Sequence, residues 1–248
     1  MEQVVNLIDK GDGIVHMIMQ DKTSKNTFSQ ALVRGLVDAF EAINATTKYK
    51  VVVLSGYENY FCCGGTKEEL FRIYNKDIKF TELDFYNLPL TCKIPVISAM
   101  QGHGIGGGLV FGLYADIVIM GNENIYTTNF MKYGFTPGMG ATLIVPYKLG
   151  ATLGNEMLFT AESYKGRKLK ERVSDIKIVP KEDVLKEAFS IARLFAEKPS
   201  LSLKTLKKHM TAEIREKLPL YIEKELEMHD ITFHNPEVAN RIEQLFGS

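Results

Sequence analysis

The chain has 248 residues, 45% hydrophobic and 24% charged, which is an ordinary composition for a globular protein with a sizeable core. Thirty lysine and arginine residues balance thirty aspartate and glutamate residues, which argues against a nucleic acid or an anionic membrane as partner. The three cysteines include one adjacent pair and show neither a disulfide pattern nor a metal-binding spacing.

The cysteine pattern indicates a reducing compartment and no metal site. Residues 1–13 lack the basic and apolar regions of a signal peptide. No apolar run reaches the roughly 18 residues that a membrane-spanning helix needs. We therefore expect a cytoplasmic protein without membrane contact.

Strand and helix patterns alternate in the first half of the chain. Strands rich in β-branched residues are predicted at residues 14–19, 49–55, 94–100 and 116–120. Helices are predicted at residues 28–45, 67–75 and 109–115. This alternation predicts an α/β fold with largely parallel strands.

Helical patterns dominate from residue 180 onwards. They predict helices at residues 181–197, 201–218 and 219–233, with Pro199 and Pro219 near two of the starts, where a missing N–H does little harm. We therefore divide the chain into a core domain at residues 1–195 and a helical C-terminal region at residues 196–248.

Two segments share the order of apolar strand, glycine turn and helix. They are FCCGGT at residues 61–66 and GHGIGGG at residues 102–108. Glycine lets the main chain take positive φ and approach a ligand closely, and the N–H groups at a helix start are unpaired. Two such turns that converge can hold one anionic oxygen, which is an oxyanion hole.

The second segment also fits the dinucleotide motif G-x-G-x-x-G through Gly102, Gly104 and Gly107. The motif lies in mid-chain, and Asp116 follows about a dozen residues later instead of the ~20 that the motif requires. This context disfavours a nucleotide site. A purely structural alternative stays open, in which the glycines only permit tight packing of helix against strand.

Four phrases resemble the crotonase (enoyl-CoA hydratase/isomerase) superfamily and follow one another in the family's order. They are FCCGGT at 61–66, IPVISAMQGHGIGGG at 94–108, ADIVI at 115–119 and YGFTPGMGAT at 133–142. The resemblance implies a β-spiral core with a helical C-terminal extension and assembly into a homotrimer or hexamer. It also places Gly65 and Gly107 where the family's oxyanion-hole amides lie.

The chain departs from the family's hydratases at both catalytic glutamates. Matching places Val110 and Phe130 at those positions. Hydration needs one group that activates water and another that supplies a proton, and these side chains can do neither. We therefore expect no hydratase activity and an acyl pocket without acidic side chains, lined by Val110, Phe130, Tyr133 and Cys63.

Residues 129–142, NFMKYGFTPGMGAT, resemble the decarboxylases of polyketide β-branching. The resemblance implies conversion of 3-methylglutaconyl thioester to 3-methylcrotonyl thioester on an acyl carrier protein, the expected partner. It implies no cofactor beyond the phosphopantetheine arm of that carrier, or coenzyme A, as the thioester handle. The catalytic lysine and histidine of these relatives match Lys79 and His229.

The chemistry gives both residues a role, in which Lys79 pairs with the substrate carboxylate and His229 supplies a proton. His229 shares one helix face with Ile222, Leu226 and Phe233, so it faces inward. Each residue also has a plainer interpretation, a surface lysine and a hydrogen-bonded core histidine. An enoyl thioester isomerase and a non-catalytic carrier-protein binding module remain as alternative functions.

Overall fold

The computed structural model describes residues 3–77, 85–172 and 175–246. The strands are β1 Val5–Asp9, β2 Ile14–Met19, β3 Val51–Ser55, β4 Tyr60–Cys62, β5 Val96–Met100, β6 His103–Ile105, β7 Ile117–Gly121, β8 Ile125–Thr127, β9 Tyr164–Lys165 and β10 Lys177–Val179. The helices are α1 Gln30–Ala45, α2 Lys67–Tyr74, α3 Leu88–Thr91, α4 Gly107–Leu113, α5 Ala141–Leu149, α6 Ala151–Thr160, α7 Gly166–Lys170, α8 Val184–Ala196, α9 Ser200–Met210, α10 Ala212–Thr232 and α11 Pro236–Leu245, with 3-10 turns η2 Met131–Tyr133 and η3 Lys181–Asp183.

In the described part of the chain, the strands form two sheets. Six strands pair in the order β1-β2-β3-β5-β7-β10, and four pair in the order β4-β6-β8-β9. The pairs β1–β2 and β8–β9 are antiparallel, and the other pairs are parallel. The predicted α/β fold with largely parallel strands is confirmed.

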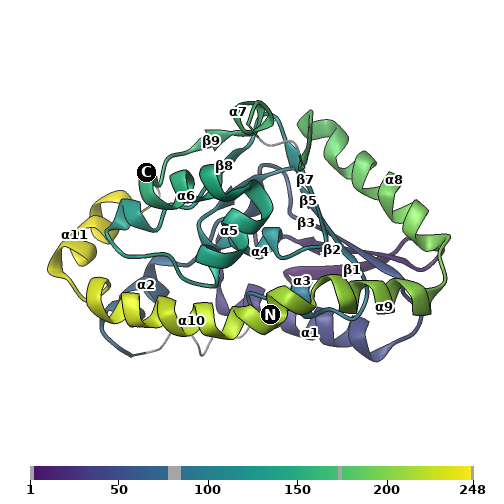
Figure 1. Cartoon of the computed structure of the whole chain (residues 1–248), viewed down its shortest axis with the longest axis horizontal. Helices are drawn as coiled ribbons and strands as arrows, with labels where there is room; N and C mark the ends of the chain where they lie inside the picture. The colour runs from purple at the N-terminus through teal and green to yellow at the C-terminus, as the bar shows by residue number, and fades with distance from the viewer. Residues whose placement is uncertain (1–2, 78–84, 173–174, 247–248) are drawn as a thin grey trace.

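Helices cover both faces of the larger sheet, which explains why its central strands are apolar throughout. Val52 and Leu54 of β3 point into the main core, whereas Val51 and Val53 pack with Ala188 and other residues of α8. Figure 1 shows α8 on one side of this sheet and α4 with α5 on the other. The alternation of side chains along β3 thus fills two cores at once.

The smaller sheet brings the two glycine segments together. β4 and β6 run parallel, with Tyr60 opposite His103 and Cys62 opposite Gly104. Parallel strands end at the same edge of a sheet, so the turns after Cys62 and after Ile105 leave that edge side by side. Each turn leads directly into a helix, α2 or α4.

The C-terminal helices α9, α10 and α11 wrap the outside of the body, and α9 and α10 together extend along the lower edge in Figure 1. The predicted break at Pro219 is wrong, because Pro219 lies inside α10 and the helix continues through it. The boundary between the two helices lies instead at Thr211, which ends α9 and precedes α10. A proline inside a helix removes one backbone hydrogen bond, and here the helix tolerates that loss.

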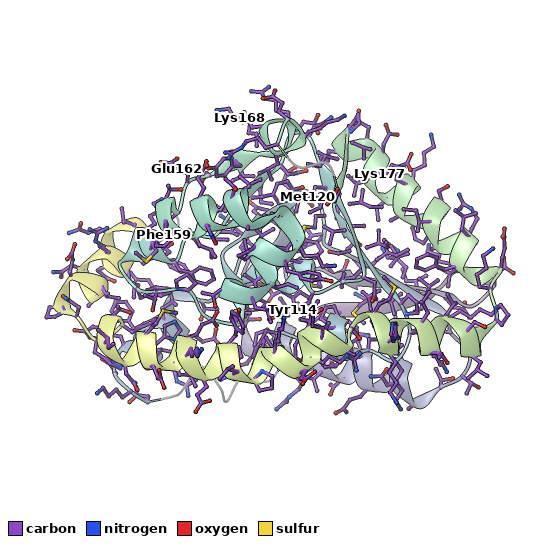
Figure 2. The ribbon with its side chains drawn as sticks, in the orientation of Figure 1. Tyr114, Met120, Phe159, Glu162, Lys168 and Lys177 are labelled. Atoms are coloured by element: carbon purple, nitrogen blue, oxygen red, sulfur yellow. The ribbon has the colours of Figure 1, made fainter. Side chains whose placement is uncertain are left out.

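Figure 2 labels two buried residues, Tyr114 and Met120, and the exposed Phe159 of α6. Phe159 is 79% exposed, against 1% for Tyr114. In the described ranges, no helix combines the length and the apolar character that crossing a membrane requires.

Candidate active site

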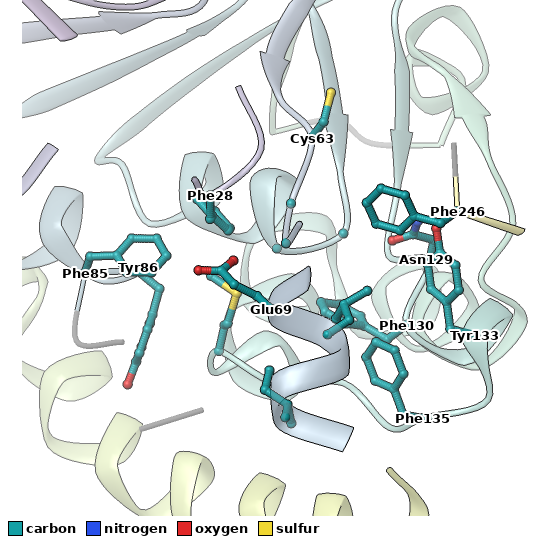
Figure 3. A pocket seen from close by; sticks show the side chains of 17 residues that line it. Phe28, Cys63, Glu69, Phe85, Tyr86, Asn129, Phe130, Tyr133, Phe135 and Phe246 are labelled. Carbon is teal, nitrogen blue, oxygen red and sulfur yellow. The ribbon is translucent and has the colours of Figure 1, made fainter. Parts of the chain in front are cut away.

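A cavity opens where the two glycine turns meet, and its wall is mostly aromatic. Figure 3 shows it from close by. The aromatic side chains of the wall are Phe28, Phe85, Tyr86, Phe130, Tyr133, Phe135 and Phe246. A largely apolar cavity with a few polar groups is the usual form of a small-molecule site.

Gly65 and Gly107 both line this cavity. Gly107 is the first residue of α4, so its N–H has no acceptor within the helix. Neither the Gly65 nor the Gly107 N–H donates a hydrogen bond to another described residue. Two amide donors with free hydrogens therefore border one space, which is the arrangement that an oxyanion hole requires.

The turns touch each other directly. A Cβ atom on Gly64 would lie 2.9 Å from the Ile105 carbonyl oxygen and 3.4 Å from the Gly107 amide nitrogen. Gly64 also has a φ of +78°, which side chains rarely adopt. Glycine at residue 64 is thus required for the two amides to share one cavity.

Three of the predicted wall residues lie at this cavity, namely Phe130, Tyr133 and Cys63. Burial raises the pKa of the Cys63 thiol to about 11, so it is not a thiolate near neutral pH. Burial also raises the pKa of the Tyr133 phenol. These groups therefore present neutral surfaces to a ligand.

Val110 does not line the cavity, in contrast to the expectation. Its side chain is fully buried in the main core of the molecule. Valine ends at its two methyl groups, and these pack into the apolar interior behind the glycine turn. The expected absence of acidic side chains is also wrong, since Glu69 of α2 lines the cavity.

His229 lies behind the aromatic wall, at a smaller cavity that it shares with Tyr86 and Met139, two residues that also line the main cavity. Its Nε2 atom lies 2.8 Å from the Thr136 carbonyl oxygen. A carbonyl oxygen only accepts hydrogen bonds, so this nitrogen carries a proton. Burial lowers the pKa of His229, which favours the neutral imidazole.

The helix that carries His229 is held by a buried carboxyl that the sequence reasoning missed. Glu225, one turn earlier on α10, accepts hydrogen bonds from the Gly140 amide at 2.7 Å and from the Thr142 amide at 2.9 Å. The Thr142 hydroxyl donates a third bond at 2.6 Å. Because His229 and Glu225 are four residues apart, they share the inward face of α10, and this spacing is the signal that could have found Glu225.

Lys79 lies outside the described residues. Within the described ranges, no group of three or more histidine, cysteine, aspartate or glutamate residues could hold a metal ion. The described lining of the main cavity contains no lysine, arginine or histidine.

Comparison with known proteins gives consistent results. The chain is 54% identical over 245 residues to the bacillaene synthase decarboxylase PksI of Bacillus subtilis (strain 168), which covers 99% of this chain and 98% of that protein. A solved structure from a study of a dehydratase/decarboxylase enzyme couple involved in polyketide beta-branching is 54% identical, with a TM-score of 0.97 over 99% of this chain and 100% of that one.

A second solved structure is the ECH2 decarboxylase domain of CurF from Lyngbya majuscula. It is 46% identical, with a TM-score of 0.95 over 99% of this chain and 100% of that one. The family model for enoyl-CoA hydratase/isomerase matches residues 9–245. The chain therefore belongs to the enoyl-CoA hydratase/isomerase family and has the crotonase fold.

Proposed function

We propose that the chain is a lyase of polyketide β-branching that decarboxylates 3-methylglutaconyl thioester to 3-methylcrotonyl thioester. The observation that carries this proposal is the pair of amides at one aromatic cavity, Gly65 and Gly107, neither of which donates to another described residue. Relatives at 54% and 46% identity over nearly their whole length are decarboxylases, which supports the same reaction here.

The reaction breaks the bond between the γ-carbon and the carboxylate. The electron pair of that bond spreads through the double bond onto the thioester oxygen, CO2 leaves, and a proton then adds to carbon. Two amide hydrogens that hold the thioester oxygen stabilise the developing charge, and loss of one such donor typically costs about 3–4 kcal/mol of barrier.

Two side chains are proposed for the remaining steps. Lys79 pairs with the substrate carboxylate before it leaves, and His229 supplies the proton. His229 and Met139 line the same smaller cavity, and Met139 separates His229 from the main cavity. A Cβ atom added to Gly107 would lie 2.5 Å from the Met139 sulfur. Movement of the flexible Met139 side chain would connect the cavity of His229 with the glycine amides.

The thioester handle is proposed to be the phosphopantetheine arm of an acyl carrier protein, with coenzyme A as the alternative that presents the same pantetheine. The chemistry needs no metal or redox cofactor. The cytoplasmic location stays a prediction. So does the division of the chain into a core domain at residues 1–195 and a helical C-terminal region at residues 196–248.

Assembly into a homotrimer or hexamer also stays a proposal. It is supported by apolar side chains at the surface near α9, where Leu206 is 56% exposed and Met210 is 66% exposed. Both residues line a groove that Tyr147 of α5 also borders. Contiguous exposed apolar surface of this kind is typical of subunit contacts.

The test is mass spectrometry of the acyl group before and after incubation of the chain with 3-methylglutaconyl thioester. We expect loss of the mass of CO2. An unchanged mass with a shifted double bond would instead assign an isomerase, and binding without any chemical change would assign a carrier-binding module.

A further inference from the structure

Glu69 is the acidic side chain of the cavity, and the start of α2 holds it there. Thr66 and Glu69 form a capping box, in which the Glu69 amide donates to the Thr66 hydroxyl oxygen at 3.1 Å. The Thr66 amide donates to Glu69 Oε2 at 3.4 Å. This reciprocal pair turns the carboxyl back toward the glycine turn.

The capping box places the carboxyl beside the proposed oxyanion hole. Thr66 follows Gly65 directly, and consecutive Cα atoms are about 3.8 Å apart. A carboxyl bonded to the Thr66 amide is therefore a neighbour of the Gly65 amide, and both residues line the cavity. Figure 3 shows the Glu69 carboxyl among the lining side chains, pointing into the cavity.

Few charges surround this carboxyl. Burial is the largest influence on this carboxyl and raises its pKa above the ordinary value. The hydrogen bonds from Thr66 and the charge of Arg72 lower the pKa, and the charge of Glu68 raises it. Across the cavity the described titratable groups are the thiol of Cys63 and the phenols of Tyr86 and Tyr133.

One further element packs against α2. Helix α11 contributes Glu243, which pairs with Lys67 at 2.5 Å and so leaves little net charge on that side. The described surroundings of Glu69 are therefore mostly apolar and favour the uncharged acid.

On the basis of the proposed decarboxylation, we propose that Glu69 is a catalytic residue that stays protonated and donates a third hydrogen bond to the thioester oxygen held by Gly65 and Gly107. Oε2 accepts from Thr66, which leaves Oε1 to carry the proton toward the cavity. The proton stays on Glu69 throughout, so no bond to it is made or broken in the reaction.

The neutral form is required by the chemistry. An ionised Glu69 would repel both the substrate carboxylate and the negative thioester oxygen. A neutral carboxylic acid that donates to an enolate oxygen is an effective stabiliser in an apolar site.

The test compares kcat as a function of pH for the wild type and for Glu69→Gln, Glu69→Ala and Glu68→Gln. Glutamine keeps the capping box and can donate an N–H, but it does not titrate. Alanine removes the donor. Glu68 is an exposed neighbour on the same turn of α2, and its charge raises the pKa of Glu69, so Glu68→Gln should keep turnover at low pH and lower the pH at which turnover starts to fall.

We expect Glu69→Gln to keep turnover within about tenfold of the wild type at low pH, and Glu69→Ala to lose about 100-fold or more. As pH rises above the pKa of Glu69 in the complex, the wild type loses its protonated form while the glutamine variant does not. The ratio of wild-type to Glu69→Gln turnover should therefore fall about tenfold per pH unit in that range.

A turnover ratio that does not change with pH would overturn the assignment. So would a glutamine variant as inactive as the alanine variant, which would indicate proton transfer instead, or an alanine variant as active as the wild type. Absence of CO2 release from the wild type would refute the proposed decarboxylation itself, which is a separate outcome.

Discussion

The contact between the two glycine turns leaves no room for a side chain at Gly64 or Gly108. A Cβ atom on Gly108 would lie 2.1 Å from the Cys62 carbonyl oxygen, a clash with backbone that a side-chain movement cannot relieve. The glycines of this site thus serve close approach of two main chains, which in turn places the Gly65 and Gly107 amides at one cavity.

Lys79 and His229 are proposed to act directly on the substrate. Changing either residue to alanine should lower turnover by about 100-fold or more, because each removes a group that positions charge or moves a proton. The measurement is the rate of CO2 release under saturating substrate. Glu227→Gln, an exposed change two residues before His229 on α10, is the control and should leave the rate unchanged.

Wild-type rates from both alanine variants would contradict these roles. In that case the plainer interpretations would hold, a surface lysine and a core histidine bonded to the Thr136 carbonyl.

Some residues of the site could be read from the sequence and others could not. The order of strand, glycine turn and helix predicts the amides of Gly65 and Gly107, because this order is visible in a short stretch of sequence. Glu69 was missed, although the pattern of Thr66 followed three residues later by a glutamate is a capping signature. The sequence could not predict that Val110 lies in the core, because a valine on a helix fits a core or a cavity wall equally well.

Helix α10 depends on Glu225 for its attachment to the start of α5. We expect Glu225→Ala to lower the free energy of unfolding by about 3 kcal/mol, because it leaves the Gly140 and Thr142 donors without a buried acceptor. Chemical denaturation with the exposed change Glu227→Ala as control measures this. Turnover should fall as well, since Glu225 holds the segment of α10 that carries His229.

Equal stability of the Glu225→Ala and Glu227→Ala variants would show that the carboxyl contributes nothing to this attachment.

The strands and helices that the sequence predicts best are those with strong internal patterns. Strand β2 at Ile14–Met19 and helix α2 at Lys67–Tyr74 agree with prediction closely. The three-residue strands β4, β6, β8 and β10 were not predicted, because segments so short carry no periodicity. The helix boundary predicted at Pro219 is wrong because tertiary packing can outweigh the local effect of a proline.

The C-terminal helices are joined to the body by a buried lysine. Lys207 of α9 pairs with Asp116 at 2.8 Å and donates to the Pro89 and Ile94 carbonyl oxygens at 2.8 and 3.0 Å. Replacing Lys207 with methionine should cost about 3 kcal/mol of folding free energy, because Asp116 and both carbonyls lose their partner. Thermal unfolding measures it, with the exposed Lys208→Met as control.

An unchanged melting temperature in the Lys207→Met variant would show that apolar packing alone holds these helices. Such long-range pairs are absent from any local pattern, since Lys207 lies 91 positions from Asp116 along the chain. The sequence therefore predicts the kind of fold but not the contacts that join its parts.

Decarboxylation at this site requires the Gly107 amide hydrogen at the thioester oxygen. Proline at the first position of α4 removes that hydrogen while fitting a helix start, and alanine adds the same Cβ atom but keeps the hydrogen. The direct measurement is the decarboxylation rate of Gly107→Pro against Gly107→Ala, with circular dichroism to verify folding of both. We predict that the proline variant is about 100-fold slower or more. Equal rates from two folded variants would contradict the oxyanion hole.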